Sequence, residues 1–488
     1  DELRAADSLP QETLEEHFFD LNNWTVARFL LASELAIRRA ATTESVSLAD
    51  EALTALNEKR HRVLVLPYAI RLYVAAGNPS DARQCLDEYV GILHTLQRQT
   101  ESRQGLAYLQ AQVAKAEDDS YAVIDALQPA IVSYASRPEL WGLLAEAFIR
   151  TDQTRRAVSA LIRYLRLRPR DPEMRQQLTK EYLKLRDWSN ALKAAQLAES
   201  LNPTEIILKL LRIEASINIS AEDPENNTPN LQSLASELVK LRTDHTDRVD
   251  IRILQAIIAV HLDDPNTAEK ELKLAIEECQ EPLRAEMQLA RFYSRMKRMP
   301  DAVNVCQAAC ESHSEVAEPW LSLSGLHAAD ADYDTARSCL RQGLDTVVDQ
   351  RQKRSLSISL ALLELVHGDR ATGISLLSEL AAQDEQEVRA RSLLLGIREV
   401  QEDQAKVQTL IDEIQEAERE SGLMWRLYQA ALWLASDEWR SKQQDIATYL
   451  QYCIDSDPEW SSPPLILAEM YEKLQDYRRV EDIYHRTL

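Results

Sequence analysis

The sequence is poor in the residues that interrupt or crosslink a chain, with ten glycines, 17 prolines and six cysteines among 488 residues. A β-rich fold needs more turn residues than this, and no Val/Ile/Thr-rich run alternates with polar residues between turn signals. The six cysteines show no CxxC spacing, so they give no sign of a disulfide framework or a zinc ribbon. These absences predict an almost wholly helical chain, and they favour a reducing compartment.

Long apolar runs and an excess of positive charge are also missing. The longest apolar candidates, 256–262 and 356–366, fall short of the roughly 18 residues that a membrane span needs, so we expect no membrane insertion. The chain has 79 acidic and 56 basic residues and a formal charge of -23. A polyanion would be repelled, so we expect no nucleic-acid partner, and the acidic charge is explained most simply by solubility.

Motifs for catalysis and metal binding are lacking too. The nine histidines form no HExxH and no close His/Asp/Cys group. The stretch Gly368 to Gly373 has the glycine spacing of a P-loop, but Ile374 stands where the phosphate-binding lysine is required, so we interpret it as a turn between helices. Cys306 and Cys310 share a helical face with His313, yet Cys306 falls at a core position. We therefore predict no enzyme, no metal site and no cofactor.

What the sequence does contain is a pattern that recurs every 34 residues. In residues 137–170 it consists of Trp141, Leu144, Ala145 and Phe148, followed by Ala157, Leu161, Tyr164 and Pro169. The same residue classes return at 171–204, 249–282, 283–316 and 317–350. Small residues let two helices approach closely, and large residues fill the space between one helix pair and the next. Because a single pair cannot bury its own apolar stripe, the pairs must stack.

This pattern resembles the tetratricopeptide repeat (TPR). In that family a large apolar residue, Leu, a small residue and an aromatic mark the first helix, alanines mark the second, and proline marks the junction. The resemblance implies an all-α, right-handed superhelical solenoid of antiparallel helix pairs, with about 11 units. Five units match well and about six more match loosely.

Departures from the period predict the domain organisation. We expect an acidic arm and irregular helical cap at 1–60, repeat pairs at 61–219, an exposed acidic loop insertion at 220–230, further pairs at 231–420, and an irregular segment followed by repeat-like pairs at 421–488. The last unit is expected to be truncated. Because the first residue is Asp1, the N-terminus is expected to be processed or trimmed, so any targeting signal is hidden and export stays open. A cytoplasmic location is the first expectation, in line with the sparse cysteines.

The resemblance also implies where a partner binds, because in the TPR family the first helices line a concave surface. By repeat register the ninth and thirteenth places of first helices hold Arg71, Lys115, Arg150, Lys180, Lys184, Arg291 and Arg295. A basic surface of this kind would receive an acidic or carboxylate-ending segment of another protein. The alternative needs no partner, because a basic residue near a helix C-terminus is favoured by the helix dipole by about 0.3–1 kcal/mol.

One conspicuous cluster falls outside this surface. Seven arginines lie between Arg150 and Arg170, and the register places Arg155, Arg156 and Arg163 on the second helix of their unit. We expect these to be surface residues in weak ion pairs. Only Arg150 belongs to the predicted binding set.

Three classes of function remain. The first is a scaffold or adaptor that binds a protein or peptide partner. The second is the repeat portion of a larger assembly, such as a bacterial envelope or exopolysaccharide-secretion machine. The third is the targeting region of an enzyme whose catalytic domain lies outside this chain. The fold alone does not decide between them.

Overall fold

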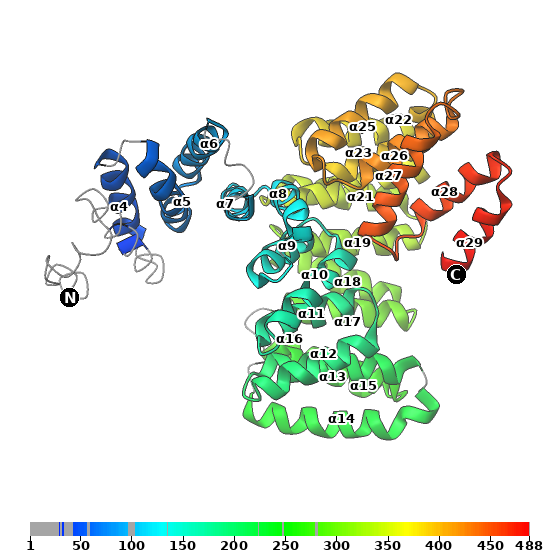
Figure 1. The fold of residues 1–488 in the computed structure, drawn as a ribbon. Helices are drawn as coiled ribbons and strands as arrows, with labels where there is room; N and C mark the ends of the chain where they lie inside the picture. The colour runs from blue at the N-terminus through cyan, green and yellow to red at the C-terminus, as the bar shows by residue number, and fades with distance from the viewer. Residues whose placement is uncertain are drawn as a thin grey trace, which may run out of the picture. The chain divides into compact units, whose positions relative to one another are not determined.

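The computed structural model describes residues 29, 32–33, 42–55, 59–95, 103–133, 135–222, 224–245, 248–278 and 282–487. These residues form 26 α-helices, α4 to α29, and contain no strand (Figure 1). The prediction of an all-α fold is confirmed. The predicted acidic arm and cap at 1–60 lies mostly outside the described residues.

The chain divides into two compact units, of which the first comprises Asp1–Pro169 with Glu418–Gly422 and the second comprises Arg170–Ala417 with Leu423–Leu488. The first contains α4 (Thr42–Ala55), α5 (Lys59–Ala75), α6 (Pro79–Thr95), α7 (Arg103–Ala116), α8 (Ser120–Ser133), α9 (Pro138–Arg150) and α10 (Thr154–Leu167).

The second unit begins with α11 (Pro172–Lys184), α12 (Trp188–Leu201), α13 (Ile206–Glu222), α14 (Pro224–Asp244), α15 (Val249–His261), α16 (Pro265–Glu278), α17 (Leu283–Arg295), α18 (Met299–Ser312), α19 (Ala317–Ala329) and α20 (Tyr333–Thr346). It continues with α21 (Gln350–His367), α22 (Arg370–Gln383), α23 (Val388–Leu395), α24 (Arg398–Gln401), α25 (Gln404–Glu418), α26 (Met424–Ala435), α27 (Gln443–Ser456), α28 (Ser462–Lys473) and α29 (Tyr477–Thr487).

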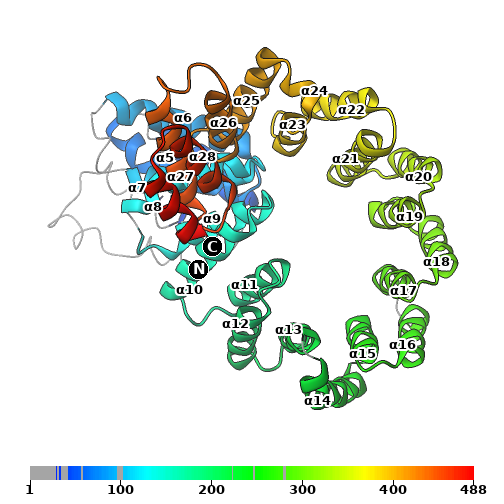
Figure 2. The same ribbon diagram turned by 90° about the vertical axis from the view of Figure 1, so that its right-hand side faces the viewer.

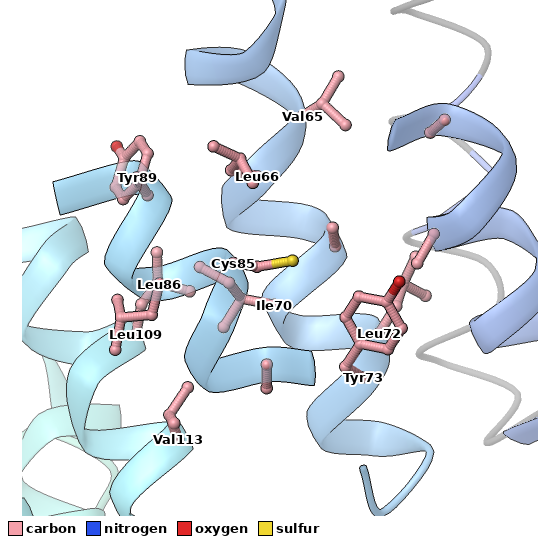
Figure 3. Packing of buried hydrophobic residues seen from close by; sticks show 14 of the residues in the cluster. Val65, Leu66, Ile70, Leu72, Tyr73, Cys85, Leu86, Tyr89, Leu109 and Val113 are labelled. Carbon is pink, nitrogen blue, oxygen red and sulfur yellow. The ribbon is translucent and has the colours of Figure 1, made fainter. Parts of the chain in front are cut away.

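The core of the first unit passes from one helix pair to the next. Figure 3 shows Leu66 and Ile70 of α5 facing Leu86 of α6, with Leu109 and Val113 of α7 beside them. Each of these side chains is at most 4% exposed. Burying an apolar side chain of this size stabilises the fold by about 1.5–3 kcal/mol. The core is therefore a row of contacts between neighbouring helices.

The second unit repeats one arrangement along its length. Its helices pack in pairs, such as α15 with α16, and the second helix of each pair packs on the first helix of the next, as α16 does on α17. In Figure 2 the odd-numbered helices from α13 to α21 lie on the inner side of an arc, and their even-numbered partners lie outside them. Across both units the described residues form eleven such pairs, with α23 to α25 between α22 and α26. The predicted helical solenoid of about 11 TPR-like units is confirmed.

The backbone of the turns carries the same period. Residues with a positive φ near 60° recur every 34 positions, at Asp118, Asp152 and Arg186 and again at Asp263, Lys297 and Ala331. The N–H that follows bonds to the carbonyl five residues earlier, as Asp332 does to His327 at 2.9 Å, which closes the helix end. The Asp332 carboxylate then accepts the N–H of Thr335 at 3.2 Å and begins α20.

Close helix packing explains one glycine inside a helix. Gly343 of α20 lies against Trp320 of α19, and a Cβ added there would stand 2.8 Å from Cγ of the indole. The indole N–H of Trp320 donates to the carbonyl of Ser314 at 3.0 Å, which fixes the ring. The corresponding Trp141 donates to Ala135 at 2.9 Å. The large residue and the small residue of the repeat are thus packing partners.

Ion pairs also join successive pairs in the second unit. Arg298, which precedes α18, bonds to Glu269 of α16 at 2.6 Å. Arg337 of α20 pairs with Glu364 of α21 at 3.2 Å, and Arg370 of α22 pairs with Glu399 of α24 at 2.6 Å. The first two cations therefore have their acids in a neighbouring helix pair, and Arg370 has its acid on α24, which follows its own pair.

The predicted loop at 220–230 is wrong for most of its length. Helix α13 continues to Glu222, and α14 begins at Pro224. Proline is accepted in the first turn of a helix, because its missing N–H would have no intrahelical partner there. The polar residues of this segment therefore accompany the start of α14 and do not form a long loop.

The irregular spacing near residue 440 corresponds to a long connection between two helices. Helix α26 ends at Ala435 and α27 begins at Gln443. Trp439 of this connection packs against the core that includes Leu450. The extra residues therefore lengthen the turn without breaking the helix pair.

Candidate interaction surface

Three successive first helices of the second unit leave the same stripe uncovered. Places i, i+4, i+7 and i+11 are exposed, half-buried, exposed and exposed in α17, in α19 and in α21. We call these twelve residues the inner face: Arg284, Gln288, Arg291 and Arg295 on α17, Glu318, Ser322, Gly325 and Ala329 on α19, and Ser355, Ser359, Leu362 and Val366 on α21. Figure 2 places the three helices on the inner side of the arc.

The opposite sides of these helices are used for packing, which is why this stripe remains. On α17 the apolar residues Leu289, Ala290 and Tyr293 are buried. On α19 the buried residues include Trp320 and Leu323. The first helix of each pair thus buries its apolar side against neighbouring helices and leaves the other side exposed to solvent.

The chemistry of the inner face changes from one helix to the next. On α17 it is basic, and the side chain of Arg291 is 56% exposed. On α19 the acidic Glu318 is followed by the small residues Ser322, Gly325 and Ala329, and no packed neighbour lies within 4 Å of the place where a Cβ of Gly325 would stand. On α21 it ends in Leu362 and Val366, which are 38% and 69% exposed. Exposed cations at one end of a face and exposed apolar residues at the other make a mixed surface of the kind that partners cover.

The basic end of the inner face is only partly neutralised. Arg284 pairs with Asp250 of α15, and Arg291 pairs with Glu318 of α19 at 3.2 Å. Arg295 has no acidic partner within the described part of the chain. Burial first, and then the charge of Arg295, lower the pKa of His261 on α15, which favours the neutral imidazole beside this guanidinium. Arg295 is therefore the cation of the inner face that is open to a carboxylate.

The predicted residues on α11 lie three helix pairs before α17. The ammonium of Lys184 bonds to Oε1 of Glu181 at 2.7 Å, and the Glu181 side chain is buried. Lys180 is half-buried, and no acid of the described residues pairs with it. Neither lysine belongs to the inner face.

The remaining predicted residues belong to the first unit. Lys115 bonds to Glu146 at 2.5 Å, and Arg150 contacts the same carboxylate at 3.6 Å and also pairs with Asp118. The guanidinium of Arg71 lies 5.6 Å from the ring centre of Tyr68. The structure thus brings Lys115 and Arg150 together around one acid, and it brings Arg291 and Arg295 together on α17.

The repeat register missed the apolar end of the inner face. Helix α21 has 18 residues where α19 has 13, so a 34-residue offset does not align Leu362 with Gly325. The capping residues carry the signal that reveals the longer helix. Asp332 caps α20 and Asp369 caps α22, and Asp369 comes three residues later than a 34-residue period requires. Aligning these caps places Leu362 opposite Gly325 and Val366 opposite Ala329.

Arg156 corrects one prediction about the arginine cluster. It was expected on the surface, but it is only 6% exposed. Its guanidinium lies 4.2 Å from the ring centre of Phe148 and donates to Oε1 of Gln128 on α8 at 2.6 Å. The planar guanidinium stacks on an aromatic ring and donates a hydrogen bond, and these two contacts offset the cost of its burial.

The candidate chemical motifs lie in packed surroundings. Cys306 and Cys310 are buried, and burial raises the pKa of their thiols to about 11 and about 12. Gly368 follows the end of α21, and Gly373 lies inside α22, so the P-loop-like stretch is a helix junction. Where the structure is described, no group of three or more His, Cys, Asp or Glu residues is placed to hold a metal ion.

The length and hydropathy of the helices bear on membrane crossing. Of the helices that the structure describes, none is both long enough and apolar enough to span a bilayer.

Comparison with known proteins gives fold-level similarities only. No family model matches the chain, and no curated protein matches it. A tetratricopeptide repeat protein from Parabacteroides merdae is similar over 54% of this chain and 99% of its own, with 14% identity and a TM-score of 0.40. Yeast Tom70 is similar over 79% of this chain and 92% of its own, with 12% identity and a TM-score of 0.39. A TPR protein from Thermus thermophilus is similar over 39% of this chain and 98% of its own, with 20% identity and a TM-score of 0.34.

The class of protein is defined by the chain's own geometry. Helix pairs with a 34-residue period in both side chains and turn backbone make it a TPR-like helical solenoid.

Proposed function

We propose that this chain is a non-catalytic scaffold or adaptor that binds a segment of another protein across the inner face of α17, α19 and α21. The observation that carries the proposal is the stripe that three successive helices leave uncovered, with its change from basic to small to apolar side chains. A surface that combines an open cation with exposed apolar residues gains from being covered.

Gly325 supports the same proposal. It is exposed near the middle of α19, and the space around it is empty. Glycine inside a helix costs about 0.5–1 kcal/mol relative to alanine, and here no neighbouring atom requires it. A bound polypeptide that approaches the helix backbone closely would explain why glycine, and not a larger residue, stands at this place.

The basic residues predicted elsewhere have a secondary role in this proposal. Arg291 and Arg295 belong to the inner face, whereas Lys180, Lys184, Arg71, Lys115 and Arg150 are candidate contacts outside it. Ion pairs to Glu146 and Glu181 already reduce the positive charge that Lys115, Arg150 and Lys184 would offer to an acidic segment.

The two other functional classes keep this binding role. A repeat portion of a larger assembly and a targeting region of an enzyme would each use the inner face to hold another chain. They differ from an adaptor in what else is attached or assembled.

The proposal is tested by filling the empty space at Gly325. The Gly325→Gln variant should fold at least as stably as the wild type, because glutamine favours a helix more than glycine by about 1 kcal/mol. It should also lose partners that the wild type retains in affinity purification followed by mass spectrometry. Gly91→Gln is the matched control, because Gly91 is likewise exposed in a helix with no atom near its Cβ position. Equal recovery of the same partners by all three proteins would contradict the proposal.

A further inference from the structure

We infer that the segment bound by the inner face carries a carboxylate and, about five to six residues away, an apolar side chain. The carboxylate would lie on Arg295, and the apolar side chain would lie on Leu362 and Val366. This inference rests on the proposed function and adds the chemistry and the spacing of the partner.

The carboxylate is placed by elimination among the cations of α17. Arg284 and Arg291 are engaged with Asp250 and Glu318, whereas Arg295 pairs with no acid of the described residues. A guanidinium binds a carboxylate through two parallel hydrogen bonds, which gives direction as well as affinity. The acidic residue of the partner should therefore meet Arg295.

The apolar side chain is placed by the far end of the inner face. Leu362 and Val366 are exposed, and the two serines that precede them on the stripe direct their hydroxyls to their own helix. Ser359 donates to the carbonyl of Ser355 at 2.9 Å, and Ser355 donates to Arg351 at 3.4 Å. The α21 end of the inner face thus offers mainly apolar contact.

The spacing follows from helix packing. Helix α17 packs directly against α19, and α19 packs directly against α21. Axes of packed helices lie about 8–10 Å apart, so two steps cover about 16–20 Å. An extended chain advances about 3.3 Å per residue, which corresponds to about five to six residues. The residues between would lie over Gly325, where the space is open, and over the exposed Ala329, whose side chain is a single methyl group.

The experiment selects random linear peptides displayed on phage against the full-length chain. Peptides whose binding falls about 10-fold or more on Gly325→Gln, and is unchanged on Gly91→Gln, report on the inner face. We expect these peptides to share an Asp or Glu and, five to six residues away, a Leu, Ile, Val, Met or Phe. The selected peptides are then synthesised, and their affinities are measured by calorimetry.

A double-mutant cycle tests the carboxylate directly. The Arg295→Gln variant should bind an acidic peptide about 10-fold more weakly, and it should bind the matching Glu→Gln peptide as the wild type does. Leu362→Ser should weaken binding of a peptide that carries the apolar residue, and it should bind a peptide with alanine in that place as the wild type does. Arg389→Gln is the control, since Arg389 is an exposed arginine outside the inner face.

The outcomes separate the two proposals. If no selected peptide is sensitive to Gly325→Gln, the inner face is not a binding surface and the proposed function is wrong. If sensitive peptides lack the acidic residue or the spacing, or if Arg295→Gln weakens acidic and neutral peptides equally, only the inference about the partner is overturned. A shared motif with coupling to Arg295 supports both.

Discussion

At the scale of the residue, the turns of this solenoid hold a left-handed conformation with residues other than glycine, of which three are aspartates and the others, such as Arg186 and Ala331, do not favour it. Eight non-glycine residues of the described chain have a positive φ, and Gly77 is the glycine that does. A positive φ costs a residue with a Cβ about 1–2 kcal/mol. Such strain persists where the surrounding structure fixes the backbone, and here the two packed helices of each pair do so.

Ala331 allows this cost to be measured without loss of a side-chain contact. We expect Ala331→Gly to raise the free energy of unfolding by about 0.5–1 kcal/mol, because relief at φ 61° exceeds the entropy that glycine adds to the unfolded chain. Urea titration followed by circular dichroism gives the value. Ala328→Gly, three residues earlier inside α19, should instead lower stability by about 1 kcal/mol. A loss of stability in both variants would show that the turn is not strained.

At the scale of the element, a buried arginine connects the C-terminal end of α22 with α23 and α25 through hydrogen bonds. The guanidinium of Arg391 on α23 donates to the carbonyls of Ala381 at 2.6 Å, Asp384 at 3.0 Å and Glu387 at 2.9 Å. Its Nε bonds to Glu413 of α25 at 2.8 Å. One side chain therefore satisfies carbonyls at the C-terminus of α22 and links α23 to α25.

Replacing this side chain should destabilise a limited part of the second unit. We expect Arg391→Met to cost about 2–4 kcal/mol, because three buried carbonyls lose their donor and Glu413 loses its partner. Hydrogen exchange should show lost protection in α22 to α25 and retained protection in α15 to α18. Arg389→Met, on the exposed side of the same helix, should change neither quantity. Uniform loss of protection along the unit would contradict this localisation.

The sequence predicted elements where core residues repeat and failed where local geometry changes. Places such as Ala145 and Leu161 recur because packing demands the same volumes, so the 34-residue period located the pairs from α9 to α12 and from α15 to α20. The lengthened α21 hid Leu362, since a fixed offset cannot register an insertion inside a helix. Arg156 was misplaced because charge suggests exposure, whereas stacking on Phe148 depends on a contact that the sequence does not display.

At the scale of the whole molecule, stability is a sum over neighbours. Within each unit the described helices contact mainly those next to them along the chain, and no single core joins all of them. In such an array, distant segments can open independently. The division into two compact units adds a further place where cooperativity can end.

Unfolding of the chain should therefore depend on the probe. Four of the eight tryptophans lie between Trp425 and Trp460, so fluorescence weights the region of α26 to α28 heavily, whereas circular dichroism reports on all helices. We expect the two signals to give different urea midpoints. Superimposable curves would show that the chain unfolds as one cooperative body.

The ion pairs between successive helix pairs have a consequence for engineering and for recombination of such repeats. Arg298 meets Glu269, and Arg337 meets Glu364, only because each cation follows or precedes the repeat that carries its acid. A repeat moved to another place would find an equivalent apolar surface to pack against, since core volumes recur, but it would find different charges. The order of these repeats is therefore written in their charges more than in their cores, and a shuffled solenoid should leave Arg298 and Arg337 without their acids.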